Sequence, residues 1–324
     1  MTGLHRLCAG LVLTSLACAR PPTQRSVAIP VSAEALSLLG DTLWSLPIPP
    51  AEGPKLVEQL SRARNRLAAS PFDVNAALVV ARRTADLGRL RESVGLYTRA
   101  GELHPTDARI PRYRGEILLQ LRELELAQRD FHEAAQRVLG KKEETEFVET
   151  TEGLLGSTLQ FNIYHLLGLT YYIKGDFVRA RTTLAEAAKA ASTGDDLAAA
   201  GIWPFFATRR LGALDEARLL LRSLSDSAQV TARQPELQLL LAFRGGVPYD
   251  SLHLNLHEKF TTERDALFGY GLGFALMLLK RDDEAELVFE QVRTYPDWSS
   301  VPVLAAEAEL ARLKSKALGR KPST

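Results

Sequence analysis

The feature that most constrains this chain is a pattern of small, aromatic and small residues that recurs with a spacing of 34 residues. Tyr97 and Phe131 hold the aromatic position in two successive copies, and a small residue stands four positions before and three positions after each. A repeated unit of this length cannot bury its apolar face alone, and stacked neighbours bury it jointly. We therefore expect the 324 residues to form a row of stacked units rather than two separate globular domains.

A later copy of the pattern is nearly complete, and it carries Tyr164, Leu167, Gly168, Tyr171, Ala180, Leu184 and Ala187. This set resembles the tetratricopeptide repeat (TPR) motif W-x2-L-G-x2-Y…A-x3-F. A C-terminal copy keeps the same register, with Leu272, Gly273, Leu276, Ala285, Phe289 and Val292. The resemblance, which extends to poorly characterised bacterial secreted TPR proteins, implies an all-α fold, an α-solenoid of stacked TPR-like helix hairpins.

The anchors of the repeat divide the chain into segments. TPR-like units start at residues 74 and 108 within 74–141, and at 161, 198, 232 and 266 within 161–299. Residues 32–73 are predicted to form the N-terminal helices of an atypical unit, whose second helix covers about 55–69. Residues 300–324 are predicted to form a C-terminal capping helix with a polar back, followed by a tail. Runs of β-branched residues at strand spacing are absent, which favours helix throughout.

An insertion separates the second and third of these units, at residues 142–160. Its first part is acidic, with Glu143, Glu144, Glu146, Glu149 and Glu152. An insertion between repeats is expected to form a loop on one face, and that face is often functional. The alternative interpretation is a solvated linker.

The first 18 residues have the features of a targeting signal and are not expected to be part of the folded body. Leu7 to Ala17 is an apolar stretch behind a short positive region, too short to span a bilayer and typical of a signal peptide. Ser15-Leu-Ala-Cys18 resembles the bacterial lipobox, so residues 1–17 are predicted to be a lipoprotein signal peptide and Cys18 the lipidated residue. Acyl chains such as palmitate would hold the protein on a membrane. The alternative is a plain signal peptide cut near Ala17 or Ala19.

The resemblance to sorted lipoproteins also implies a location. Ala19 follows the cysteine, and in bacterial sorting the absence of Asp there implies the outer membrane, facing the periplasm. Residues 18–31 are rich in Pro and polar side chains and are predicted to be a tether between lipid and folded body.

The composition excludes several functions. Lys and Arg total 40 against 39 Asp and Glu, and this near balance argues against a nucleic-acid binder that works through bulk charge. Beyond Cys18 the chain has no cysteine, so the body can hold neither a disulfide nor a thiolate metal site. No nucleophile motif or phosphate-binding loop is present. We therefore predict no catalytic residue, no cofactor and no metal.

One pair of residues keeps a distant enzymatic alternative open. His253 and His257 lie one helical turn apart, a spacing that can bind zinc. The zincin motif needs Glu directly after the first His, and Leu254 stands there instead. Two half-exposed helix histidines are the simpler interpretation.

The TPR resemblance implies a concave groove, lined by the first helix of each unit, that binds a partner protein or peptide. The predicted groove residues are polar or basic in the first half and aromatic or apolar in the second. They are Asn75, Arg82, Arg109, Arg112, Tyr113, Glu116, Asn162, His165, Tyr172, Tyr270 and Phe274. Such a groove would suit an extended peptide with an acidic part and an apolar part.

These observations together predict a non-catalytic scaffold or adaptor, lipid-anchored in the bacterial cell envelope, that binds protein partners. Outer-membrane TPR lipoproteins that act as adaptors are a looser resemblance, which rests on the lipobox and the repeats. The alternative function is an assembly or secretion factor for pilus, polysaccharide or outer-membrane components. A metal-dependent envelope enzyme is the third possibility.

Overall fold

The computed structural model describes residues 33–48, 50–150, 153–222, 230–231, 233–245, 256 and 258–319. The predicted signal peptide at 1–17, Cys18, the tether at 18–31 and the pair His253 and His257 lie outside these residues. The location in the cell envelope and zinc binding by the histidine pair therefore stay predictions. Within the described residues, no helix combines the length and apolarity that crossing a bilayer requires.

Helices make up most of the described chain, and two short hairpins of strands interrupt them. The elements in chain order are β1 (Ala33–Leu36), β2 (Thr42–Trp44), α1 (Gly53–Ala69), α2 (Val74–Asp86), α3 (Leu90–Leu103), α4 (Arg109–Gln120), α5 (Leu124–Val138), β3 (Thr145–Thr150), β4 (Gly153–Thr158), α6 (Leu159–Lys174), α7 (Phe177–Lys189), α8 (Gly194–Arg210), α9 (Leu214–Arg222), α10 (Gln234–Gly245), α11 (Glu263–Leu278), α12 (Asp282–Val292) and α13 (Val301–Ala317).

The helices pair as the repeat predicts, and one contact defines the hairpins. A glycine in the first helix lies against a large residue 16 positions later in the second helix. A β-carbon at Gly168 would lie 2.5 Å from Leu184 Cγ, and one at Gly273 would lie 2.5 Å from Phe289 Cε1. Only glycine fits at so close an approach of two helices. The predicted all-α solenoid of TPR-like hairpins is confirmed by this packing.

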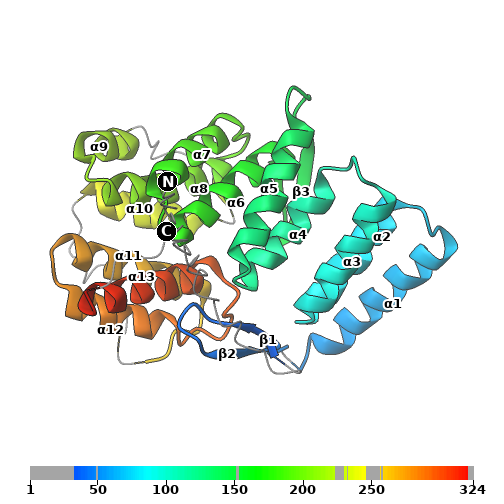
Figure 1. Cartoon of the computed structure of the whole chain (residues 1–324), viewed down its shortest axis with the longest axis horizontal. Coiled ribbons are helices and arrows are strands. Elements are labelled where there is room, and N and C mark those ends of the chain that lie inside the picture. The colour runs from blue at the N-terminus through cyan, green and yellow to red at the C-terminus, as the bar shows by residue number, and fades with distance from the viewer. Residues whose placement is uncertain are drawn as a thin grey trace, which may run out of the picture.

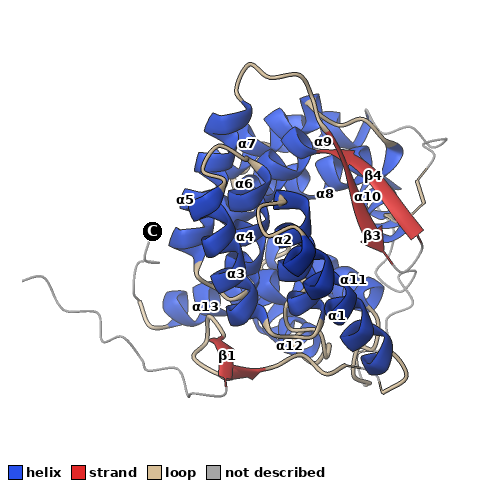
Figure 2. Cartoon of the chain, turned by 90° about the vertical axis from the view of Figure 1, so that its right-hand side faces the viewer, coloured by secondary structure: helices blue, strands red, loops and turns tan. Residues whose placement is uncertain are grey.

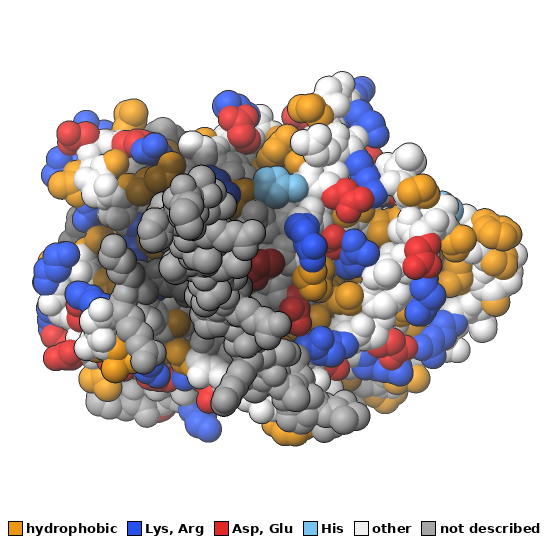
Figure 3. Space-filling view, in the orientation of Figure 1, with side chains coloured by type: hydrophobic (Ala, Val, Ile, Leu, Met, Phe, Trp, Pro, Cys, Tyr) orange, Lys and Arg blue, Asp and Glu red, His pale blue; other side chains and the backbone are white. Residues whose placement is uncertain are grey.

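The hairpins stack along a curved path (Figure 1). Helices α1–α3 lie at one end, α4–α9 continue from them, and α11–α13 return on the other side of the molecule. The largest cluster of buried apolar side chains joins helices from α4 to α13, whereas the α1–α3 end contributes smaller clusters. Hydrophobic side chains are visible at that end, over α1 and α2 (Figure 3), where Phe72 is 78% exposed.

Residues 32–73 were predicted to be helical, and this prediction is wrong for the segment before α1, which forms two strands. Strands β1 and β2 pair antiparallel, with Ala33 opposite Trp44 and Leu36 opposite Thr42. The physical reason is the turn between them, where the Ser37 hydroxyl accepts hydrogen bonds from backbone N–H groups two and four residues later. Such a side-chain bond competes with helix. Helix α1 lies where the second helix of this unit was expected.

The insertion at 142–160 is not a loop but a second antiparallel hairpin, at the opposite end of the molecule from β1 (Figure 2). Its register runs from Thr145 opposite Thr158 to Thr150 opposite Gly153. Polar contacts hold its base on the helices, since Ser157 Oγ donates to Asp196 Oδ1 at 2.7 Å. A loop or a solvated linker was predicted here, and the segment forms strands instead because they gain order from contacts with α8 that are distant in sequence.

Helix α13 coincides with the predicted C-terminal helix, but the polar back expected of it is absent. Residues 302–310 are all buried, including Glu307 and Glu309. Besides α12, the helix packs against α11 and α6, the first helices of other units. It therefore lies across the interior of the curve instead of only covering its end.

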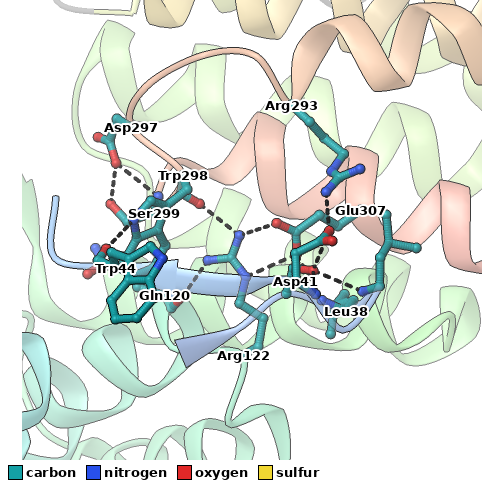
Figure 4. A network of polar contacts seen from close by, with 12 residues as sticks. Leu38, Asp41, Trp44, Gln120, Arg122, Arg293, Asp297, Trp298, Ser299 and Glu307 are labelled. Atoms are coloured by element: carbon teal, nitrogen blue, oxygen red, sulfur yellow. Dashed lines mark hydrogen bonds and ion pairs between the residues drawn. The ribbon is translucent and has the colours of Figure 1, made fainter. Parts of the chain in front are cut away.

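A buried ion pair fixes α13 to the middle of the chain (Figure 4). Arg122, in the turn between α4 and α5, donates to Glu307 from Nη2 at 2.7 Å and from Nε at 3.1 Å. Its Nη2 also donates to the Trp298 carbonyl at 2.8 Å. Both side chains are less than 4% exposed. Glu307 Oε2 further accepts the backbone N–H of Leu38 at 3.1 Å, so three distant segments meet at one carboxylate.

The N-terminal hairpin completes this junction. Trp298 Nε1 donates to the Trp44 carbonyl at 2.8 Å, and Arg293 forms an ion pair with Asp41 (Figure 4). Glu34 of β1 accepts the backbone N–H of Arg91 in α3 at 2.9 Å, so the strands bridge the two ends of the described solenoid.

Two turns offer a matched test of this junction. Arg122 and Lys280 both adopt a positive φ, at 65° and 63°, in helix-hairpin turns where Gly88, Gly175 and Gly212 do the same. We expect Arg122→Gly to lower the free energy of unfolding by about 3 kcal/mol, because it leaves the buried carboxylate of Glu307 without a cation. Lys280→Gly is expected to stay within about 1 kcal/mol of wild type, because relief of backbone strain offsets the added flexibility of the unfolded chain.

Urea denaturation followed by circular dichroism measures both variants. Equal stability of Arg122→Gly and Lys280→Gly would contradict a stabilising role for the junction.

Candidate functional site

The predicted groove residues of the first two units contact one another across the repeat. Arg109 Nη1 donates to Asn75 Oδ1 at 2.8 Å, and these residues stand 34 positions apart, at the same position of successive units. The Arg109 guanidinium is oriented by Asp107, which accepts from its Nε at 3.0 Å. Both residues lie at the start of first helices, α2 and α4. The repeat register alone therefore brings them together.

A second group of predicted groove residues surrounds the ring of Tyr113. The Arg82 and Arg112 guanidinium carbons lie 4.8 and 4.6 Å from the ring centroid. The ring of Tyr97 stacks on it at 6.0 Å, with the planes 20° apart. Cation–π contacts of this kind hold both arginines in place. We call Arg82, Arg112, Tyr113, Glu116, Glu146 and Asn162 the arginine–tyrosine cluster.

Arg112 is the buried centre of the arginine–tyrosine cluster, at 4% exposure. Its Nη1 donates to Glu116 Oε2 at 2.5 Å, and its Nε lies 3.4 Å from Glu146 Oε2. Burial works against the charged guanidinium, but the carboxylates of Glu116 and Glu146 outweigh it and raise the pKa of Arg112. Asn162 donates to the same Glu146 carboxylate.

Tyr113 is half-buried. Burial and the nearby carboxylate of Glu146 raise its pKa to about 12, so the phenol stays neutral at physiological pH. Arg82, beside it, is also half-buried, and among the described residues no carboxylate lies within ion-pair distance of it. The cluster members that keep exposed surface are Arg82, Tyr113, Glu116 and Asn162.

Glu146 is the member of this cluster that the groove prediction missed. It belongs to β3, in the inserted hairpin, and only 6% of it is exposed. The acidic composition of the insertion was a visible signal. No signal in the sequence indicated the ion pair of Glu146 with Arg112, 34 positions earlier, because that contact requires the insertion to fold back onto α4.

His165 was predicted to line the groove, but the structure buries it. It is 5% exposed and stacks on Phe161 with ring centroids 5.3 Å apart. Its Nδ1 has no hydrogen-bond partner among the described residues. Burial, together with the charge of Arg233, lowers its pKa to about 3. The side chain is therefore neutral and cannot act as a surface contact.

The three aromatic groove residues of the second half are interior residues in this structure. Tyr172, Tyr270 and Phe274 have no exposed surface. The Tyr172 and Tyr270 hydroxyls lie 2.6 Å apart, and Tyr270 donates to Glu309 of α13 at 3.4 Å. The prediction of an accessible aromatic half is corrected here, because Trp203 and Phe206 of α8 pack against these rings and Glu309 of α13 accepts a hydrogen bond from Tyr270. Burial is also the main reason that the pKa of Tyr270 lies well above its usual value.

No group of three or more His, Cys, Asp or Glu residues with metal-site geometry occurs among the described residues. The pair His253 and His257 is outside them. On the visible face, cationic and anionic side chains are interspersed over the described surface (Figure 3).

Comparison with known proteins gives structural neighbours but no relatives by sequence. No family model and no curated protein matches the chain. The structure is similar to MamA (AMB-1), at 15% identity and a TM-score of 0.40, over 61% of this chain and 94% of that chain. It is similar to YrrB, described as a TPR protein with an unusual peptide-binding site, at 14% identity and a TM-score of 0.42, over 75% and 95%.

A third neighbour is the TPR domain of P58(IPK), at 14% identity and a TM-score of 0.23, over 83% of this chain and 96% of that chain. YrrB and the P58(IPK) domain are described as TPR proteins. The TPR-like fold of this chain follows from its own hairpin packing.

The burial of His165 predicts a pH dependence. Between about pH 6.5 and pH 3 the unfolded chain binds a proton at this imidazole and the folded chain does not, so stability falls as the pH falls through that window. The contribution reaches about 1.4 kcal/mol per pH unit. We expect His165→Gln to show a shallower loss of unfolding free energy between pH 6.5 and pH 4, in urea titrations at several pH values. An imidazole resonance of His165 that titrates near pH 6.5 by nuclear magnetic resonance would refute this.

Proposed function

We propose that the protein is a non-catalytic scaffold that binds an extended segment of a partner protein over the arginine–tyrosine cluster. The observation that carries the proposal is the half-buried side chain of Tyr113, with two guanidinium groups and the ring of Tyr97 against its ring. Arginine and tyrosine are enriched at the residues that dominate binding energy in protein interfaces. The neighbouring contacts fix these side chains in advance, which lowers the entropy cost of binding.

The position of the cluster supports this assignment. Its residues lie on α2, α4 and α6, first helices of successive units, with Glu146 added from β3. The corresponding face in the second half is covered by α13. A partner segment is therefore expected to contact the first half of the curve.

The charges of the cluster define the chemistry of the partner. Arg112 is balanced by Glu116 and Glu146, whereas Arg82 faces no carboxylate among the described residues. An acidic side chain of the partner would form an ion pair with Arg82, and an apolar or aromatic side chain would pack on Tyr113. The sequence also predicted an apolar part in the peptide. Its expected contacts, Tyr172, Tyr270 and Phe274, are buried and offer it no binding surface.

A charge reversal tests the proposal. We expect Arg82→Glu to weaken binding of acidic peptides on an array by at least about tenfold, since a charge-assisted contact becomes a repulsion. Arg129→Glu makes the same change on the exposed side of α5 and is the matched control. The proposal fails if both variants bind the array as wild type does, or if wild type binds no peptide.

We further propose that the scaffold is lipid-anchored at Cys18 in the bacterial envelope, on the outer membrane facing the periplasm. The support is the sequence of residues 1–18, with Ala17 before the cysteine and no other cysteine after it. We expect wild type to incorporate radioactive palmitate and Cys18→Ala to lose the label. Labelling that survived in Cys18→Ala would rule out this anchor.

A further inference from the structure

A cavity of about 780 Å³ lies at the turn ends of several hairpins, away from the arginine–tyrosine cluster. The end of α8, the start of α9, the end of α11 and the helix α13 line it, and it is open to the surface. Small-molecule sites in proteins occupy about 300–1,000 Å³, so its size suits a small organic ligand.

Its lining is strongly cationic. Arg209, Arg210, Lys280, Arg312 and Lys316 line it, against the carboxylates of Asp282 and Glu309, which leaves an excess of three positive charges. Both carboxylates are already paired. Glu309 lies 2.9 Å from Arg312 and 3.2 Å from Arg210, and Asp282 lies 2.5 Å from Lys316.

The two inner arginines are fixed in advance. The guanidinium carbons of Arg210 and Arg312 lie 4.6 and 5.5 Å from the ring centroid of Phe177, also in the lining. Arg312 Nη1 donates to the Ile173 carbonyl at 3.0 Å. Guanidinium groups with set orientation favour carboxylate and phosphate ligands.

Arg209 and Lys280 differ from these arginines, because no carboxylate of the described residues lies within ion-pair distance of either. Burial and repulsion from Arg218 lower the pKa of Arg209, so a bound anion would relieve an existing cost.

The backbone of Lys280 provides an independent indication. Its φ is 63°, in the turn position that glycine holds in three other hairpins. A residue with a β-carbon in this conformation costs about 1–2 kcal/mol. A long cationic side chain at a strained turn, lining a cavity and facing no anion among the described residues, is poorly explained by stability alone.

The rest of the lining is apolar, with Leu214, Leu278 and Leu313 among its side chains. We propose that this cavity binds a small organic dianion, a phosphomonoester or a dicarboxylate, that carries an apolar body. Arg209 and Lys280 contact its charged groups, and the leucines pack on the body. This site lies outside the arginine–tyrosine cluster and does not rest on the scaffold function, so either proposal can fail alone.

Isothermal titration calorimetry of the full-length chain tests the site with phenyl phosphate and phthalate as dianionic probes and benzyl alcohol as the neutral control. We expect at least one dianion to bind, benzyl alcohol not to bind, and added salt to weaken binding. Arg209→Gln and Lys280→Gly are each expected to lower the affinity about tenfold, because each removes one charge-assisted contact. Comparing the two probes separates phosphate from carboxylate recognition.

Lys189→Gln, on the exposed side of α7, is the matched control and should bind as wild type does. Lys280→Gly keeps the glycine-compatible turn, so lost affinity at unchanged stability assigns the lysine to the ligand rather than to the fold. The proposal is overturned if neither dianion saturates the protein below about 10 mM, or if Arg209→Gln and Lys280→Gly both keep wild-type affinity.

Discussion

The arrangement of this molecule depends on two carboxylates buried on one helix. Glu307 and Glu309 of α13 are at most 1% exposed, and a carboxylate removed from water is strongly unfavourable unless cations and hydrogen bonds compensate it. Arg122 compensates Glu307, whereas Arg210 and Arg312 compensate Glu309. Burial alone would raise the pKa of Glu309, but these two arginines outweigh it and lower that pKa below its usual value. Helix α13 can lie inside the curve because Arg122 and Arg210 from other hairpins meet its carboxylates there, beside its own Arg312.

This docking divides the inner surface of the solenoid. Over the second half, α13 turns first-helix aromatics such as Tyr270 into core residues. Over the first half, Tyr113 and Arg82 keep accessible surface. The same helix also supplies one wall of the cationic cavity, since Arg312 and Lys316 lie on it. One packing event thus determines which predicted groove residues stay available and creates a site that the repeat pattern does not contain.

The parts of the structure that could be predicted from sequence are those set by local spacing. Gly168 opposite Leu184 and Asn75 beside Arg109 follow from a 34-residue register and from the geometry of one hairpin. The contacts that escaped prediction join residues far apart, such as Arg122 with Glu307, separated by 185 positions. The strand hairpin β3–β4 escaped prediction for a related reason, because the short insertion at 142–160 is ordered by contacts with α4 and α8.

The two non-glycine residues at strained turns show how stability and binding can be told apart. Arg122 and Lys280 occupy the same left-handed turn position, and both give up the glycine found in other turns. For Arg122, contacts with a buried carboxylate, a carbonyl and the face of Trp298 offset the strain of this backbone conformation. Lys280 finds no such compensation among the described residues, although it lines a cavity with an excess of positive charge. A strained conformation persists only when something stabilises it, and for Lys280 an anion bound in that cavity would do so.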